Sequence, residues 1–240
     1  MNRFFLSSVP LIALFLLFIS FPFSSFAAGS PIYIASPNKK VKVSVWTDKQ
    51  GEIKYSIHYD GKIVFEPSQL GLKTQKEDFM KALSFKGATA NKVISSSYES
   101  VQGKRKNNTY TANERILSWE NENKNTISIC FQVSNEGLAF KYILPKYSTS
   151  TDYINQERTS YNFPQAAKAW LQPMAIAKSG WEQTNPSYEE HYQNAIPVGT
   201  MESTKTGWVY PALFETDGTW VLITESGLDR NHSATRLHFD

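Results

Sequence analysis

The stretch that decides the fold is TISICFQVSNEGLAFKYIL, residues 126–144. Every second residue from 127 to 133 is a large apolar one, which is the period of a β-strand with one buried face. Residues 135–137, Asn-Glu-Gly, favour a turn, and a second apolar run follows over 138–144. We therefore predict an antiparallel hairpin at this point of the chain.

The same period-two pattern occurs upstream. Apolar residues alternate with polar ones over 41–45 and again over 53–59. The pair Asp60-Gly61 is a strong signal for a two-residue hairpin turn before a third apolar run over 62–65. We therefore expect three strands joined by tight turns near the start of the domain.

The polar middle of the chain carries weaker signals. We predict strands over 93–101 and 110–119, with 102–108 as the solvated tip of the hairpin between them. The chain shows no long run with the period of a helix after its first residues, and we expect at most a helical turn or two over 77–83.

The last third of the chain again indicates strands. We predict one over 159–163 and a hairpin of 209–215 and 219–225 around the turn Asp217-Gly218. Many short strands at regular spacing with turn signals indicate an all-β antiparallel sandwich. We assign it to residues 29–240 and expect it to be cut at its C-terminal end, because the strand-like pattern runs up to Asp240.

The first 28 residues have the layout of a secretory signal peptide. A short basic start precedes an apolar run over 4–23, and small residues follow at 24–29. The apolar run is long enough for a membrane anchor, but the small residues that follow favour cleavage. We expect export to the periplasm or the medium and no membrane contact after cleavage.

Composition excludes some functions. The net charge of +3 leaves no basic stripe, which argues against nucleic acid as a partner. Cys130 is the single cysteine, so the chain makes no internal disulfide, and we expect it to serve as a small buried apolar residue.

The segment 169–193 is the candidate functional loop. It holds two tryptophans, two tyrosines, three glutamates and a histidine, interrupted by proline and glycine. Loops on a rigid scaffold often carry function, and aromatic rings beside carboxylates suit a sugar or metal site. The alternative is that the rings only close one end of the sandwich while the carboxylates lie in water.

Four segments together resemble the N-terminal domain of glycoside hydrolase family 97, the secreted bacterial α-glucosidases and α-galactosidases. They are the first meander over 36–72, the hairpin 135–142, the loop segments 169–173 and 188–192, and the last hairpin over 211–228. The resemblance implies an antiparallel β-super-sandwich, the fold also found in galactose mutarotases. It also implies that a (β/α)₈ barrel, absent from these 240 residues, carries the glycosidase carboxylates.

The resemblance further implies a calcium ligand. Tyr188, Glu189 and Tyr192 match the family's Tyr-Glu-x-x-Tyr spacing, so Glu189 is the predicted ligand and Glu190 the alternative if the register differs by one. Calcium takes 6–8 oxygen ligands, so one glutamate completes a site but does not make one. The predicted sugar contacts are Trp181, Tyr188 and Tyr192, and the expected partner is an oligosaccharide or α-glycoside.

We predict no catalytic residue in this chain. Glycoside hydrolysis needs two carboxyl groups about 5–9.5 Å apart on either side of the bond. Glu189 and Glu190 are adjacent, and neighbours on an extended segment point to opposite faces. A free-standing carbohydrate-binding module is the first alternative. The second is an aldose mutarotase that pairs His191 with Glu225 or Glu189, since histidine titrates near neutral pH.

Overall fold

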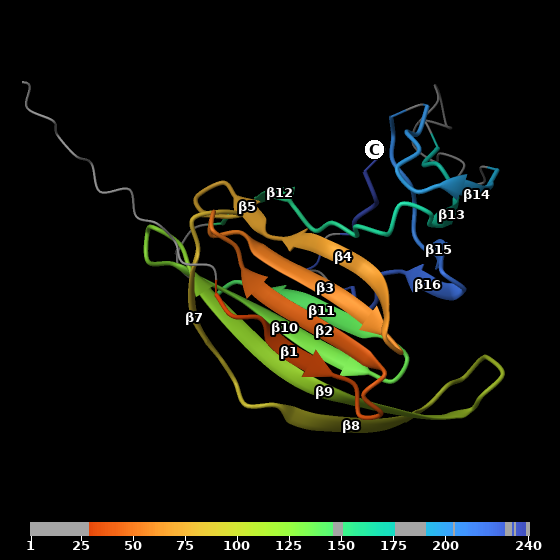
Figure 1. Cartoon of the computed structure of the whole chain (residues 1–240), viewed down its shortest axis with the longest axis horizontal. Helices are drawn as coiled ribbons and strands as arrows, with labels where there is room; N and C mark the ends of the chain where they lie inside the picture. Colours follow the sequence, from red (N-terminus) through yellow and green to blue (C-terminus); the bar gives the residue numbers. More distant parts are fainter. Residues whose placement is uncertain are drawn as a thin grey trace, which may run out of the picture.

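The computed structural model describes residues 29–145, 151–175, 191–203, 205–228, 232 and 234–238. Within these residues the chain forms sixteen β-strands in four antiparallel sheets and no helix (Figure 1). The described parts contain no helix long and apolar enough to cross a membrane. The predicted all-β antiparallel fold is therefore confirmed.

Sheet A is the predicted meander with one more strand. Its order follows the chain: β1 (Ile32–Ala35), β2 (Val41–Thr47), β3 (Ile53–Tyr59) and β4 (Lys62–Leu70). The turn between β3 and β4 has positive φ at both central residues, Asp60 (49°) and Gly61 (86°). Two positive φ values match the twist of a two-residue hairpin, which confirms this turn.

Sheet C contains the hairpin that decides the fold. It has β7 (Ser84–Ala88), β8 (Lys92–Glu99), β9 (Asn107–Glu120), β10 (Thr126–Ser134) and β11 (Leu138–Ile143). In the predicted hairpin Phe131 lies opposite Phe140. Strand β9 is longer than predicted because β10 covers one of its edges while β7 and β8 share the other.

Two smaller sheets join segments that lie far apart in the chain. Sheet B has the order β12 (Ile154–Glu157), β5 (Leu72–Thr74), β6 (Asp78–Phe79). Sheet D has the order β14 (Gln193–Pro197), β13 (Lys168–Leu171), β15 (Ala212–Thr216), β16 (Thr219–Ile223). In sheet D, β15 and β16 form the hairpin expected around Asp217-Gly218.

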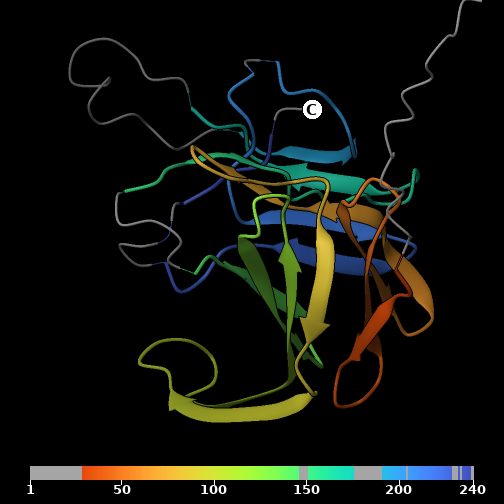
Figure 2. The same ribbon diagram turned by 90° about the vertical axis from the view of Figure 1, so that its left-hand side faces the viewer.

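The core lies between sheets A and C, which face each other as two layers in both views (Figures 1 and 2). Tyr55 of β3 meets Phe140 of β11 at a ring-centroid distance of 6.2 Å. Trp119 is buried between the layers and donates its indole N–H to the Thr47 hydroxyl over 2.9 Å. A buried indole N–H needs such a partner. Alternating residues of β2, β3 and β10 supply much of this core.

Sheet D lies at one end of the sandwich, and its strands run across those of sheets A and C (Figure 2). Three phenylalanines connect it to sheet A. Phe163 stacks on Phe214 of β15 with centroids 4.4 Å apart, and Phe65 of β4 meets Phe163 edge-on at 4.8 Å. The hairpin tips also touch through an ion pair between exposed Lys62 and Asp217, 3.0 Å apart.

Two sequence-based predictions are wrong. The helical turn expected over 77–83 is replaced by the short strand β6 and an irregular segment, which buries Phe79 and Leu83 in the core. The strand expected over 159–163 is irregular. Its backbone hydrogen bonds to β4 run from the Ser160 N–H to the Gln69 carbonyl and from the Glu66 N–H to the Asn162 carbonyl, which is a change of register, and Pro67 of β4 has no N–H to donate.

Close packing against the segment after β6 makes Gly51 irreplaceable. Its φ is +73°, and a Cβ built on it would lie 2.6 Å from the Leu83 nitrogen. Gly61 also has a positive φ, +86°, but a Cβ there would meet nothing within 4 Å. An alanine at position 61 therefore has only the strain of a positive φ, whereas an alanine at position 51 has the same strain and also a steric clash.

We expect Gly51→Ala to lower the free energy of unfolding by about 2 kcal/mol more than Gly61→Ala, because overpacking adds to the strain that both variants share. Urea denaturation of the two variants checks this. Equal losses would show that the segment around Leu83 moves away at little cost.

Candidate functional site

The candidate loop begins and ends at one edge of sheet D. Leu171, at the end of β13, pairs with Gln193, at the start of β14. The residues that enter the loop therefore lie beside those that leave it. Figure 1 shows β13 and β14 together at this end of the molecule, away from the layers of sheets A and C. Tyr192 directly precedes β14, and 47% of its surface is exposed.

Most of the predicted site residues lie outside the described residues: Glu189, Glu190, Trp181 and Tyr188. The structure describes Tyr192 and His191 of the same loop, and both are exposed. The described parts contain no group of three or more His, Cys, Asp or Glu placed to hold a metal ion. The metal assignment therefore stays a prediction.

The base of the loop is held by short antiparallel contacts. The Met174 N–H donates to the Gly207 carbonyl over 2.8 Å, and the Val209 N–H donates to the Gln172 carbonyl over 3.0 Å. On its other side, Trp208 exchanges both backbone hydrogen bonds with Leu237. A Cβ on Gly207 would lie 2.5 Å from the Leu237 carbonyl oxygen. Only glycine therefore lets the segment around Leu237 approach this closely.

A buried carboxylate, Glu202, organises the turn beside this base. Its side chain is 1% exposed, and it accepts a hydrogen bond from the Thr206 N–H over 2.9 Å. The Thr206 hydroxyl lies 3.3 Å from the same carboxylate oxygen and donates to the Met174 carbonyl over 2.7 Å. Glu202 thus connects the turn to the strand that enters the loop. A buried charge is tolerated only when it is hydrogen-bonded in this way.

We expect Glu202→Ala to lower the free energy of unfolding by about 1–3 kcal/mol, because it removes the buried carboxylate that accepts the hydrogen bond from the Thr206 N–H. Glu202→Gln keeps an acceptor oxygen and should lose less. Exposed Glu66 on β4 supplies the control, and Glu66→Ala should change stability by less than about 0.5 kcal/mol. Urea denaturation, together with amide exchange at Thr206, tests this role of Glu202. Equal losses of stability in Glu202→Ala and Glu66→Ala would contradict it.

A row of phenols lies where the irregular segment 158–163 meets sheets C and D. Tyr55 donates to the Ser160 carbonyl over 2.8 Å, and the Tyr142 hydroxyl lies 2.8 Å from the Thr159 hydroxyl. Tyr161 and Tyr210 lie close enough for each phenol to influence the pKa of the other. Burial, before any other cause, raises the pKa of all four phenols. Neutral phenols act as hydrogen-bond donors and as packing groups.

Glu225 belongs to the same region and has a structural role. Its carboxylate accepts hydrogen bonds from the Thr235 N–H over 3.1 Å and from the Thr235 hydroxyl over 2.6 Å. The structure thus places Glu225 on Thr235, and the carboxylate holds the end of the described chain against sheet D. This arrangement gives no support to the predicted pairing of Glu225 with His191.

The raised pKa values predict a loss of stability in alkali. Each phenol stays protonated in the folded state, so its contribution is complete below the ordinary phenol pKa of about 10. That contribution is lost as the pH rises from there toward the raised folded-state pKa. We expect the buried tyrosines to ionise only when the chain unfolds. Absorbance at 295 nm measures the ionisation, and far-UV circular dichroism measures the unfolding. Complete ionisation of all 12 tyrosines in a chain that keeps its β-signal would contradict this.

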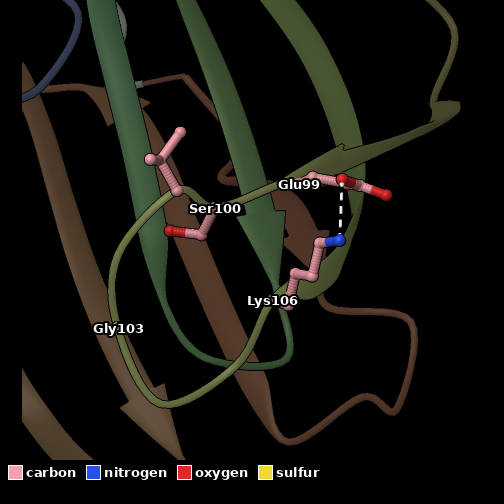
Figure 3. Close-up of a pocket in the computed structure, with 5 residues that line it drawn as sticks. Glu99, Ser100, Gly103 and Lys106 are labelled. Carbon is pink, nitrogen blue, oxygen red and sulfur yellow. Dashed lines mark ion pairs between the residues drawn. The ribbon is translucent and has the colours of Figure 1, made fainter.

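A hollow lies at the tip of the β8–β9 hairpin (Figure 3). Its volume is about 450 Å³, and it is lined by Glu99, Ser100, Val101, Gly103 and Lys106. Figure 3 shows Glu99 and Lys106 facing each other across it as an ion pair, 3.5 Å apart. Both side chains are largely exposed, as is Val101. The prediction of a solvated hairpin tip at 102–108 is confirmed.

Sequence reasoning missed two features of this end of the fold. Glu202 and Thr206 are four residues apart in a turn, and an acidic residue before a Ser/Thr-rich turn was the available signal. Trp220 was assigned to a strand but to no site. The structure places its indole 4.7 Å from that of Trp170, with the two planes at 45°. No sequence pattern connects these two tryptophans, because they lie on strands separated by β15.

The fold and this edge of sheet D define the chain as an all-β sandwich domain of the super-sandwich type. It belongs to the family described as Glycosyl-hydrolase 97 N-terminal, whose model matches residues 34–240. The predicted family is therefore confirmed.

Individual relatives agree with the family. A probable retaining alpha-galactosidase of Streptomyces bingchenggensis (strain BCW-1) is 27% identical over 89% of this chain and 31% of its own length. The crystal structure of a beta-arabinopyranosidase matches with a TM-score of 0.81 and 31% identity, over 87% of this chain and 33% of the other. The chain thus spans about a third of these relatives.

A more distant structure matches in fold alone. A glycoside hydrolase family 97 enzyme from Pseudoalteromonas sp. strain K8, in complex with panose, is 19% identical with a TM-score of 0.63. The match covers 78% of this chain and 27% of that enzyme. At this identity the likeness supports the super-sandwich and nothing about the ligand.

Proposed function

We propose that this chain is the N-terminal domain of a calcium-dependent α-glycoside hydrolase, in which it forms part of the wall of the substrate pocket. The observation that carries the proposal is the family match over residues 34–240. Sheet D supports it, because the strands of its edge deliver the loop 172–192 from one end of the sandwich. A barrel domain in the remaining two thirds of the enzyme would carry the chemistry.

In this proposal the loop contributes to a calcium site shared with the barrel. Glu189 supplies one carboxylate, with Glu190 as the alternative, and the barrel supplies the other oxygen ligands that calcium needs. When bound, the ion would fix the loop and bind an oxygen of the substrate or of water as a Lewis acid. Trp181, Tyr188 and Tyr192 would contact the sugar. The exposure of Tyr192 at the base of the loop is compatible with that role.

The proposed substrate is an α-galactoside or a β-L-arabinopyranoside. The two relatives with the highest identity described above are a probable retaining alpha-galactosidase and a beta-arabinopyranosidase. The two glycosides have the same ring configuration, and the arabinoside only lacks the hydroxymethyl group at C5. One pocket therefore accepts both more easily than it accepts an α-glucoside, whose C4 hydroxyl points the other way.

A free-standing carbohydrate-binding module is the second candidate. The exposed aromatic side chains of Trp220 on sheet D and of Tyr192, which directly precedes β14, favour it. Aromatic rings bind the apolar faces of pyranoses without any catalytic group. In this version the chain binds oligosaccharide alone and needs neither calcium nor a barrel.

The proposal includes export. Residues 1–28 would be removed as a signal peptide, and the mature domain would begin near Gly29, in the periplasm or outside the cell. The small residues at 24–29 support cleavage over anchoring. N-terminal sequencing of the protein recovered from a Gram-negative host tests this cleavage. A protein in the membrane fraction that still begins at residue 1 would contradict it.

A chimera tests the shared calcium site. The chain would replace the N-terminal third of the beta-arabinopyranosidase that it matches over 33% of that chain. We expect the isolated chain to hydrolyse neither aryl α-galactoside nor aryl β-L-arabinopyranoside, and the chimera to hydrolyse at least one in a reaction that a calcium chelator stops. Hydrolysis of either glycoside by the isolated chain would contradict the proposal.

Glu189→Gln in the chimera should weaken calcium binding about 10-fold or more, by analogy with the loss of a group that supports a metal site. Glu190→Gln is the matched control and should leave it near wild type. Calcium affinity is read from the dependence of activity on free calcium. If Glu190→Gln weakens calcium binding and Glu189→Gln does not, then Glu190 is the ligand. If neither variant weakens calcium binding, this chain does not contribute to the calcium site.

A further inference from the structure

The outer face of sheet D has a regular arrangement of side chains. Pairing of β13, β15 and β16 lines up two cross-strand rows on one face: Lys168, Glu215 and Trp220, and then Trp170, Leu213 and Leu222. Residues of the opposite face are buried under Phe163, among them Ala169, Ala212 and Phe214. The two rows therefore face away from the core, and we call them the outer face.

This face exposes more apolar surface than the rest of sheet D. Trp220 is 58% exposed and Leu222 is 59% exposed, while Trp170 and Leu213 are partly covered. The same fold buries Trp119 and Trp208 almost completely. The largest contiguous apolar patches on folded domains are often binding surfaces.

We propose that the Trp170–Trp220 pair is a binding platform for short α-linked oligosaccharides. The two indole rings lie 4.7 Å apart with their planes at 45°. Consecutive rings of a β-1,4-linked chain form a flat ribbon, which requires coplanar aromatic rings. An α-linked chain turns between residues, and two tilted rings fit that turn. The inference rests on the proposed function for its ligand class, because a domain of a glycoside hydrolase meets such chains.

The polar groups on the face suit an uncharged ligand. Exposed Lys168 supplies a cation, and Glu215 supplies an anion in the same row. One oxygen of Glu215 accepts a hydrogen bond from the Gly218 N–H over 2.6 Å, which fixes the carboxylate at the edge of the face. The charges balance, so the face attracts neither anions nor cations. An ammonium and a carboxylate both hydrogen-bond to sugar hydroxyls.

The size of the patch also favours a sugar over a protein. Trp170, Leu213, Trp220 and Leu222 together expose an apolar area on the order of 300 Å². A specific protein interface needs about 800 Å² from each partner. Two pyranose rings cover an area closer to that of the patch than to that of a protein interface.

Isothermal titration of the chain with maltotriose, raffinose and cellotriose tests the platform. We expect saturable binding of at least one of the two α-linked sugars and none of β-linked cellotriose. Trp220→Ala should weaken that binding at least 10-fold, and Trp220→Phe should retain most of it. Tyr98→Ala is the matched control, an aromatic residue of similar exposure (57%) on the β8 edge, and should bind as wild type. Circular dichroism establishes that each variant is folded.

Three results would overturn the platform: no binding of any α-linked sugar by the wild-type chain, equal affinity of Trp220→Ala and wild type, or a wild-type dimer that Trp220→Ala converts to a monomer. The last would make the face a contact between copies. The titration contains no barrel, so failure here leaves the shared calcium site standing. An inactive chimera whose sandwich still binds sugar would instead refute the proposed function alone.

Discussion

The position of sheet D depends on the contact between Phe65, Phe163 and Phe214. Phe163 comes from an irregular segment, stacks on sheet D and meets sheet A edge-on. Each buried phenylalanine contributes about 2–3 kcal/mol. The Lys62–Asp217 ion pair at the hairpin tips is exposed and contributes at most about 1 kcal/mol. Aromatic burial therefore decides where sheet D lies, and with it the candidate loop and the tryptophan pair.

Different parts of the fold provide the stable core and the proposed binding surface. Sheets A and C form a two-layer core of alternating residues, and a buried hydrogen bond between Trp119 and Thr47 connects the two layers. Sheet D has its inner face in that core and its outer face and loop edge in contact with solvent. Glu202 and the phenol row add hydrogen bonds at the joint, where the chain is irregular and a ladder cannot satisfy the backbone. A sheet held in this way is suited to present the binding surface proposed above.

Local patterns predicted the sandwich well and its edges poorly. The hairpin of β10 and β11 and the turn at Asp60-Gly61 follow from alternation and turn residues, which act between near neighbours. Strands β12, β13 and β14 form only because distant segments pair with them, and their sequences carry little alternation. The expected helical turn over 77–83 was wrong for a related reason. Burial of Phe79 and Leu83 in the core outweighs the local preference.

The sequence alone determined the all-β class, the first meander, the central hairpin and the family, because all of these depend on short-range periodicity and ordered motifs. It also pointed to the loop 169–193, through composition. Only the tertiary structure decided that this loop leaves from the β13–β14 edge, that Glu202 is buried beside it, and that Trp170 and Trp220 are neighbours. These facts depend on which distant strands share a sheet. That choice follows from packing between Phe65, Phe163 and Phe214, which lie about 50–100 residues apart and have no local signature.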